Sequence, residues 1–265
     1  MSSETGVLDP TFDEIIESVF EDSDEIRLVN PAPEVFRSVM LTASEFEDEL
    51  PDLQVLAVSD VLKAAVEDFI LASQIADLVD QETLSLRSTA DISQNSLFIS
   101  ENEVAIVVTL DSEITALNST EKDFVEKMQA AFLDEWEEGD DFSLRTPPLS
   151  RVKETLAEEF GEDVQEDFLM MLEEADTVPG ENDQLDEVAI ALLVGANNGE
   201  LLYNISKWGE DTGLASKATF SRTKTQLEDR DIIETEKVPI EVGRPRLRLL
   251  LIPESLEDIN SIPAK

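Results

Sequence analysis

The sequence contains no histidine and no cysteine. It therefore offers no imidazole as a general base near neutral pH, no thiolate nucleophile, and no imidazole or thiolate ligand for a metal ion. These two absences exclude histidine-dependent serine hydrolases, cysteine proteases, zinc fingers, iron–sulfur proteins and folds that are held together by disulfide bonds.

Glycine is scarce in the first half of the chain, where Gly6 and Gly139 are the only examples before residue 140. Loops that bind phosphate groups need glycine because backbone amides must approach the anion closely. Residues 7–138 therefore hold neither a P-loop nor a dinucleotide-binding fingerprint. We expect a protein that is not an enzyme, with no catalytic residue, no metal site and no cofactor.

Long apolar segments are absent too. The longest wholly apolar run, Val188–Val194, has seven residues, whereas a membrane-spanning helix needs about 20. The first ten residues carry Glu4 and Asp9 in place of the basic segment that opens a secretion signal. We therefore expect a cytoplasmic protein with no membrane partner.

Negative charge is what the sequence has in excess. Asp and Glu number 61 against 19 Lys and Arg, which gives a formal net charge of -42. Leu, Ile, Val and Phe nevertheless make up 82 of the 265 residues, well above the share in a disordered chain. A folded protein with an acidic surface is expected. Such a surface suits concentrated salt, which screens repulsion between like charges, and it favours the cytoplasm of a halophile.

Residues 1–146 alternate short apolar runs with stretches of helical periodicity, which is the pattern of an α/β layer domain. Strands are predicted at Ile26–Val29, Leu53–Val58, Leu84–Leu86, Leu97–Ile99 and Val104–Val108. Helices are predicted at Phe12–Phe20, Glu34–Thr42, Val61–Leu78 and Thr120–Trp136. Pro147 and Pro148 interrupt the pattern and end this domain, for which we expect a role in sensing, in dimerisation or in both.

Residues 147–182 are predicted to form a helical connector and a linker. Two helices are expected at Ser150–Phe160 and Asp163–Glu174, and Gly161 ends the first of them. The polar stretch Asp176–Asn182 contains a Pro-Gly pair and is typical of a linker.

Residues 183–265 show the order helix, helix, turn, helix and hairpin, which is typical of a winged helix-turn-helix. The first two helices contain Leu185–Leu192 and Leu201–Trp208, Ser216 is a suitable N-cap for the third helix, and the hairpin strands begin at Ile232 and Arg246.

The charge of this C-terminal region differs from that of the rest of the chain. Residues 203–248 contain nine Lys and Arg against eight Asp and Glu, whereas the remaining 219 residues contain ten against 53. Residues 216–227 and 242–252 each carry three cations and no carboxylate. These are the recognition helix and the wing, the two elements that a winged helix presents to DNA.

Helical geometry divides the third helix into two faces. Phe220 and Leu227, seven residues apart on this helix, are expected in the core. Trp208 of the preceding helix is expected in the core as well. On the opposite face Arg222 can make a bidentate contact with guanine, and Ala218 and Thr225 can touch thymine methyl groups. Lys217 and Lys224 are expected beside phosphates. The predicted DNA-binding residues are Lys217, Ala218, Ser221, Arg222, Lys224, Thr225, Arg244 and Arg246.

Two segments of the chain resemble the haloarchaeal TbsP family of transcriptional regulators. They are RTPPLSRVKETLAEEFGE at Arg145–Glu162 and the run of residues from Leu201 to Leu250, whereas the first 140 residues are similar mainly in their pattern and in segments such as Asp68–Asp77. The resemblance implies a DNA-binding winged helix behind a family-specific N-terminal domain, and it supplies no catalytic residue.

Three functions compete at this point. The first is a sequence-specific transcription regulator that binds double-stranded DNA as a homodimer, with a possible small-molecule effector that is unidentified. The second is a winged-helix adaptor of the transcription machinery that binds protein. The third is a metal enzyme that uses carboxylates alone, with Asp134–Asp141 as its best candidate, although Trp136 would then occupy a ligand position of a calcium loop.

A dimer is expected because one winged helix reads only a few base pairs among very many competing sites. The predicted contact lies in the α/β domain or in the helices of residues 150–174, which carry Leu156, Phe160, Phe168, Met171 and Leu172. The alternative is that these side chains pack only against their own chain.

Overall fold

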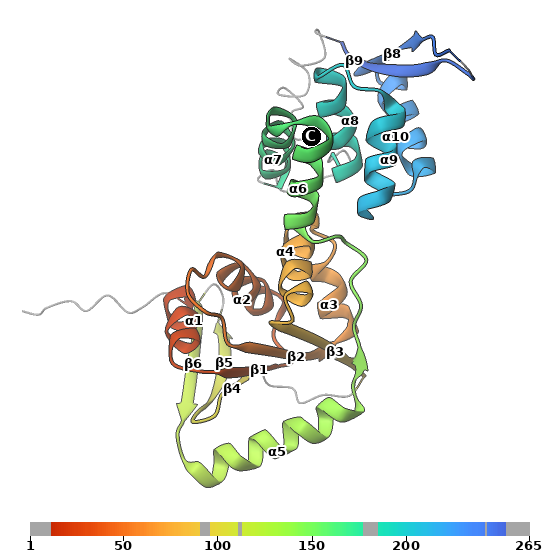
Figure 1. Ribbon diagram of the computed structural model, residues 1–265. Coiled ribbons are helices and arrows are strands. Elements are labelled where there is room, and N and C mark those ends of the chain that lie inside the picture. Colours follow the sequence, from red (N-terminus) through yellow and green to blue (C-terminus); the bar gives the residue numbers. More distant parts are fainter. Residues whose placement is uncertain (1–11, 91–95, 111–112, 177–184, 242, 253–265) are drawn as a thin grey trace, which may run out of the picture. The chain divides into compact units, whose positions relative to one another are not determined.

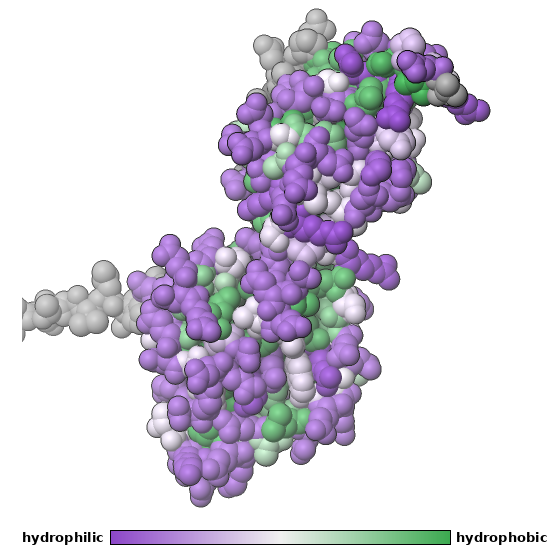
Figure 2. Space-filling view, in the orientation of Figure 1, coloured by the Kyte–Doolittle hydropathy of each residue, from purple (hydrophilic) through white to green (hydrophobic). Residues whose placement is uncertain are grey.

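The computed structural model describes residues 12–90, 96–110, 113–176, 185–241 and 243–252 (Figure 1). The chain divides by its internal contacts into two units, Met1–Leu144 and Arg145–Lys265. Each unit has a hydrophobic interior, and Figure 2 shows that hydrophilic residues cover most of the visible surface. The acidic composition of the chain is therefore accommodated on the surface.

The first unit is built on one mixed sheet, in which the described residues contribute seven strands. These are β1 (Glu25–Val29), β2 (Asp52–Val58), β3 (Leu84–Thr89), β4 (Ser96–Ile99), β5 (Val104–Leu110), β6 (Glu113–Ser119) and β7 (Asp140–Asp141). Their order across the sheet is β6-β5-β4-β1-β2-β3-β7. The central strands β1, β2 and β3 are parallel, and the other neighbours are antiparallel.

Helices cover both faces of this sheet (Figure 1). One face carries α1 (Phe12–Glu21), α2 (Pro33–Glu45), α3 (Ser59–Ala65) and α4 (Phe69–Asp80), and the other carries α5 (Lys122–Glu138). Alternate residues of β2 serve the two layers, since Val55 packs with the first group and Leu56 packs with Phe132 of α5. The expected α/β layer domain is confirmed as a mixed α/β sheet domain.

The single helix predicted at Val61–Leu78 is wrong, because the structure has two helices there. The chain leaves the helical path after Ala65, and the carboxylate of Asp68 then accepts a hydrogen bond from the Leu71 amide at 3.1 Å. Asp68 therefore acts as the N-cap of α4. The apolar spacing continues across this break because both helices pack on the same face of the sheet.

Strands β6 and β7 were not predicted from the sequence. The sequence of β6, EITALNS, has weak apolar alternation, yet the strand pairs with β5 along its whole length. β7 consists of two aspartates that pair with Arg87 and Ser88 of β3. Pairing with an existing strand stabilises both segments, although their own β propensity is low.

The second unit is a helical domain with a hairpin, and its helix-turn-helix confirms the predicted fold class. Its elements are α6 (Leu149–Phe160), α7 (Glu162–Asp176), α8 (Glu187–Asn197), α9 (Leu202–Thr212), α10 (Lys217–Asp229), β8 (Ile233–Val238) and β9 (Arg246–Leu251). α8 is its centre, since nine consecutive residues from Val188 to Ala196 are buried. This explains why the longest apolar run of the sequence forms a helix without an exposed face.

α6 and α7 share the interior of the second unit. Leu156, Phe168 and Leu172, which were considered for a dimer contact, are buried within their own chain. The Phe160 and Phe168 rings lie edge-on to Trp208 of α9, with ring centroids 6.2 and 6.1 Å away. The packing of these side chains is thus accounted for without a second subunit.

Among the helices of the described residues, none has the length and apolar character that crossing a membrane requires. Within the same residues, no group of three or more carboxylates is arranged to hold a metal ion.

Candidate nucleic-acid interface

The turn between α9 and α10 is fixed by local geometry. Gly213 ends α9 in the left-handed region with a φ of 91°, a conformation that glycine adopts without steric cost. Ser216 is the N-cap residue directly before α10, and its hydroxyl oxygen accepts a hydrogen bond from the Thr219 amide at 3.2 Å. The predicted N-cap is therefore present.

The two helices approach each other closely where Gly209 of α9 faces Phe220 of α10. A Cβ atom on Gly209 would lie 2.3 Å from two atoms of the Phe220 ring. Phe220 and Leu227 are buried, as their spacing predicted, and so is Thr223. This contact determines which side of α10 faces solvent.

The exposed side of α10 holds the residues expected there. Ala218, Ser221, Arg222 and Thr225 are all exposed, and they recur at helical spacing on one face. Within the described part of the chain, the Arg222 guanidinium has neither a hydrogen-bond partner nor an ion-pair partner. It is therefore available to a ligand without prior loss of an internal contact.

The two lysines of α10 are engaged with carboxylates. Lys217 forms an ion pair with Glu210 of α9. Lys224 pairs with Glu228 at 2.5 Å, and the same carboxylate accepts a hydrogen bond from the Thr235 hydroxyl of β8 at 2.9 Å. The Lys224 side chain is only 13% exposed, so this pair joins α10 to the hairpin.

The hydrogen bond between Lys217 and Glu210 lowers the pKa of the Glu210 carboxyl and raises the pKa of the Lys217 ammonium. A neighbouring pair behaves in the same way, since the hydrogen bond between Lys207 and Asp211 lowers the pKa of Asp211 and raises that of Lys207. Both pairs are thus fully charged near neutral pH.

The hairpin formed by β8 and β9 lies beside these helices. The β9 strand is joined to the segment before α9, because the Leu249 amide donates to the Glu200 carbonyl at 2.8 Å and Leu201 forms an antiparallel bridge with Arg248. The Arg244 and Arg248 side chains are exposed.

Arg246 is held against α9 by two contacts. Its guanidinium carbon lies 3.8 Å from the centroid of the Tyr203 ring, and a guanidinium nitrogen donates to the Asn204 side-chain oxygen at 3.4 Å. Cations in this position are attracted by the negative face of the ring. The Arg246 side chain is therefore oriented before any ligand arrives.

A groove of about 380 Å³ lies between α9, the beginning of α10 and the hairpin. Its described lining residues are Leu202, Tyr203, Ser206, Lys217, Ser221, Arg244, Pro245, Arg246 and Leu247. None of these nine residues is a carboxylate, and three are cations. Three of the predicted DNA-binding cations, Lys217, Arg244 and Arg246, are thus brought together, whereas Lys224 does not line the groove.

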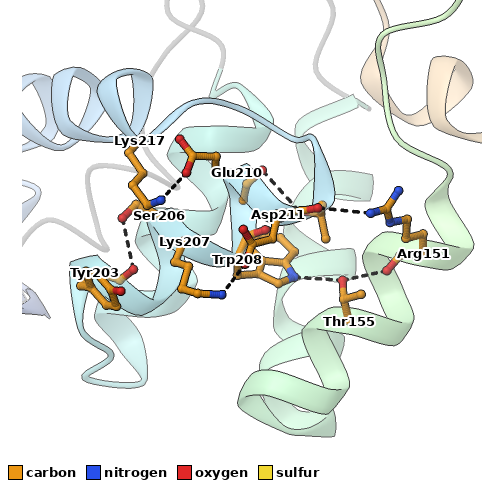
Figure 3. A network of polar contacts seen from close by, with 11 residues as sticks. Arg151, Thr155, Tyr203, Ser206, Lys207, Trp208, Glu210, Asp211 and Lys217 are labelled. Atoms are coloured by element: carbon orange, nitrogen blue, oxygen red, sulfur yellow. Dashed lines mark hydrogen bonds and ion pairs between the residues drawn. The ribbon is translucent and has the colours of Figure 1, made fainter.

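Figure 3 shows how the cations of this region connect to the rest of the second unit. The Trp208 indole N–H donates to the Thr155 hydroxyl of α6 at 3.0 Å, and Thr155 donates in turn to the Arg151 carbonyl at 2.8 Å. The Arg151 guanidinium donates to the Asp211 carbonyl at 3.2 Å. α6 therefore supports the helix that carries Glu210.

Sequence reasoning missed Tyr203, Asn204 and Glu210. Their partners, Arg246 and Lys217, come from other elements, so no local spacing reveals these contacts. One signal was present, because Tyr203 is the single tyrosine of the chain and lies in its least acidic region.

The acidic stretch Asp134–Asp141, considered for a metal site, lies at the end of α5 and in β7. The Arg87 guanidinium donates to the Asp141 carboxylate at 3.0 Å and to the Trp136 carbonyl at 2.6 Å. The stretch thus contacts a cation from the protein itself.

One similar solved structure is that of TrmBL2, an archaeal chromatin protein whose structure shows a novel mode of DNA binding. It is 15% identical to the chain, with a TM-score of 0.35, and the match covers 48% of each chain. The chain spans about half the length of that protein, and at this TM-score the likeness does not bear on function. Among curated proteins, none matches the chain.

Models of a protein family match both parts of the chain. Residues 4–147 match the N-terminal model of TbsP-like transcriptional regulators, and residues 148–263 match the model of their C-terminal helix-turn-helix domain. The second match includes α6 and α7, which agrees with their shared interior with α8 and α9. The chain therefore belongs to the TbsP-like family of transcriptional regulators.

Proposed function

We propose that the chain is a sequence-specific, DNA-binding transcription regulator of a halophilic archaeon, acts in the cytoplasm and is not an enzyme. In this proposal α10 enters the major groove and the β8–β9 hairpin acts as a wing on the adjacent backbone or minor groove. The exposed face of α10 carries the argument. From Lys217 to Leu227 it has no carboxylate, in a chain with 61 of them, and the first acidic residue on this face is Asp229 in the last turn. Among the described residues Arg222 has no partner, and it lies on the same helix as part of a groove that contains three cations.

Base contacts are assigned to the exposed face of α10. Arg222 is suited to a bidentate contact with the O6 and N7 atoms of guanine, and Ser221 can donate to or accept from either base of a pair. Ala218 and Thr225 are suited to thymine methyl groups. All four side chains are exposed and small or flexible enough to reach a groove floor.

Backbone contacts are assigned to Lys217, Arg244 and Arg246, because these cations surround the groove at the edge of α10. Lys224 is assigned a different role. Its side chain is mostly buried and pairs with Glu228, which supports a structural contact between α10 and β8 in place of the phosphate contact expected from the sequence.

We further propose a homodimer on a twofold axis, because two copies of α10 would double the base contacts and impose regularly spaced half-sites. The α/β unit is the proposed site of dimerisation and of binding to a small-molecule effector. Light scattering on the full chain in molar potassium salt tests the dimer, which predicts twice the 29.4 kDa mass of one chain.

The test of sequence-specific binding compares wild type with Arg222→Ala. Duplexes retained by the wild-type chain in molar potassium salt are selected from genomic DNA, and affinities are then measured for a selected duplex and for DNA of mixed sequence. Losing the Arg222 contact should cost about 1–3 kcal/mol on the selected duplex and much less on the mixed one.

Lys63→Ala in the first unit is the matched control, since it also removes one cation. Equal losses for Arg222→Ala on both duplexes would assign Arg222 to the backbone. If the wild-type chain retains no DNA at all, the proposed function is wrong and a protein-binding adaptor becomes the better explanation.

A further inference from the structure

The groove between α9, α10 and the hairpin is lined by Lys217, Arg244 and Arg246, and its nine described lining residues include no carboxylate. Carboxylates outnumber cations by 61 to 19 in this chain. A concave surface of the opposite character has the charge that an oxyanion requires. Its volume of about 380 Å³ is enough for one phosphate group with part of its sugars.

Two of the three cations are already positioned within the free protein. Arg246 lies over the Tyr203 ring and donates to Asn204, which fixes its guanidinium at the groove. Lys217 is held at the groove by Glu210, whose carboxylate does not line it. Glu210 thus engages one of the three N–H donors of the Lys217 ammonium, the group that an incoming oxyanion would contact.

The Lys217–Glu210 pair differs from the neighbouring Lys224–Glu228 pair in its exposure. The Lys217 and Glu210 side chains are 44% and 45% exposed, whereas those of Lys224 and Glu228 are 13% and 28% exposed. An exposed ion pair contributes little net stability and opens readily. The Lys217–Glu210 pair can therefore exchange its anion while α10 stays in place.

We propose that this groove binds one phosphate of the DNA backbone, and that this phosphate displaces Glu210 from Lys217, so that one anion is exchanged for another at the same ammonium group. The inference rests on the proposed DNA-binding function and specifies how the protein contacts the DNA backbone. Tyr203 and Asn204 act as positioning residues, because they hold Arg246 where the displacing phosphate arrives.

Anion exchange has a measurable consequence for the salt dependence of binding. A lysine that neutralises a phosphate releases a counterion from DNA, which contributes about -0.9 to the slope of log K against log salt concentration. Here the released Glu210 carboxylate takes up a cation as the phosphate loses one. The contact at Lys217 should therefore add almost nothing to the slope, and binding at this position should tolerate concentrated salt.

The test measures affinity of the full chain for a short duplex of mixed sequence as the potassium chloride concentration is varied. Glu210→Gln removes the internal anion and keeps the side-chain shape. This variant should bind more tightly at the lowest salt concentration, and its slope should be more negative than that of wild type by about 0.9. Glu234→Gln is the control, because Glu234 is an exposed carboxylate on β8 that does not line the groove.

A second comparison isolates the role of Lys217. In a Lys217→Met background, Glu210→Gln should leave the slope unchanged, because no ammonium remains to exchange its anion. Thermal unfolding of each variant verifies that the exposed substitutions leave the fold intact.

Equal slopes for wild type and Glu210→Gln, or an equal change for Glu234→Gln, would overturn the exchange. In that case DNA binding by wild type and the Arg222→Ala loss would still support the proposed function. If wild type fails to bind DNA, both the function and the exchange are refuted.

Discussion

Gly209→Ala should weaken the second unit, although alanine is the better helix former. An added Cβ atom would lie 2.3 Å from the Cε2 and Cζ atoms of Phe220, whereas carbon atoms in contact are about 3.5–4.0 Å apart. Phe220 is fully buried, so its ring has no space into which it can move. The clash must displace the Phe220 ring against its buried neighbours or separate α9 from α10.

The expected magnitude combines two opposing effects. Overpacking of a filled core costs about 1–3 kcal/mol, and replacing a glycine inside a helix by alanine recovers about 1 kcal/mol. We therefore expect a net loss of up to about 2 kcal/mol in the free energy of unfolding. Because the Gly209 contact sets the orientation of α10, affinity for a selected duplex should fall as well.

Denaturant unfolding in molar potassium salt measures the loss, and a double-mutant cycle identifies its cause. Phe220→Leu removes part of the ring that Gly209→Ala would touch, so the double variant should lose less than the sum of the two single losses. Strictly additive losses, or a Gly209→Ala variant more stable than wild type, would refute the proposed close contact.

Two further predictions concern stability. Burial raises the pKa of Glu187 at the start of α8. The folded chain therefore binds this proton more tightly than the unfolded chain does. The stability of the fold should fall as pH rises from about 4.3 through the raised pKa. Glu187→Gln should therefore raise the Tm at pH 7, and a gain that persists below about pH 4 would contradict this cause. Trp208→Phe removes the indole hydrogen bond to Thr155 and part of a buried ring, and it should cost about 1–3 kcal/mol. An unchanged Tm for Trp208→Phe would show that α6 does not support α9.

The position of α10 was predictable because its determinants are local. Ser216 lies directly before the helix, where its hydroxyl can cap the first turn, and Phe220 and Leu227 are seven residues apart on one helical face. The residues on the opposite side of the helix could then be assigned to the exposed face. No alternative periodicity competes in this segment, so the sequence and the structure agree on its core.

The contacts of the groove were not predictable, because each joins elements that meet only in the folded chain. Arg246 and Tyr203 are 43 positions apart, and Glu210 faces Lys217 only because Gly213 reverses the chain between them. The break between α3 and α4 was missed for a different reason. Asp68 caps the start of α4 and so divides the segment into two helices, while the apolar spacing that predicts a helix continues past it.

The α6–α7 region shows how an apolar excess can be interpreted in two ways. Leu156, Phe168 and Leu172 suggested either a dimer contact or internal packing, and the sequence alone could not decide between them. In the structure they are buried within their own chain, and the Phe168 ring lies edge-on to Trp208. The partner of such side chains depends on tertiary neighbours that the spacing of α6 and α7 does not reveal.

The central claim, that the exposed face of α10 lies in a groove of DNA, has a direct test. The chain has no cysteine, so Ser221→Cys creates a single thiol to which an iron chelate that cleaves nearby DNA can be attached. Met170→Cys on α7 is the matched control, because Met170 is also exposed. The account predicts a narrow cluster of cuts within a selected duplex from the reagent at position 221 and none from position 170. Equal cleavage from both positions, or none from position 221 while the duplex is bound, would contradict it.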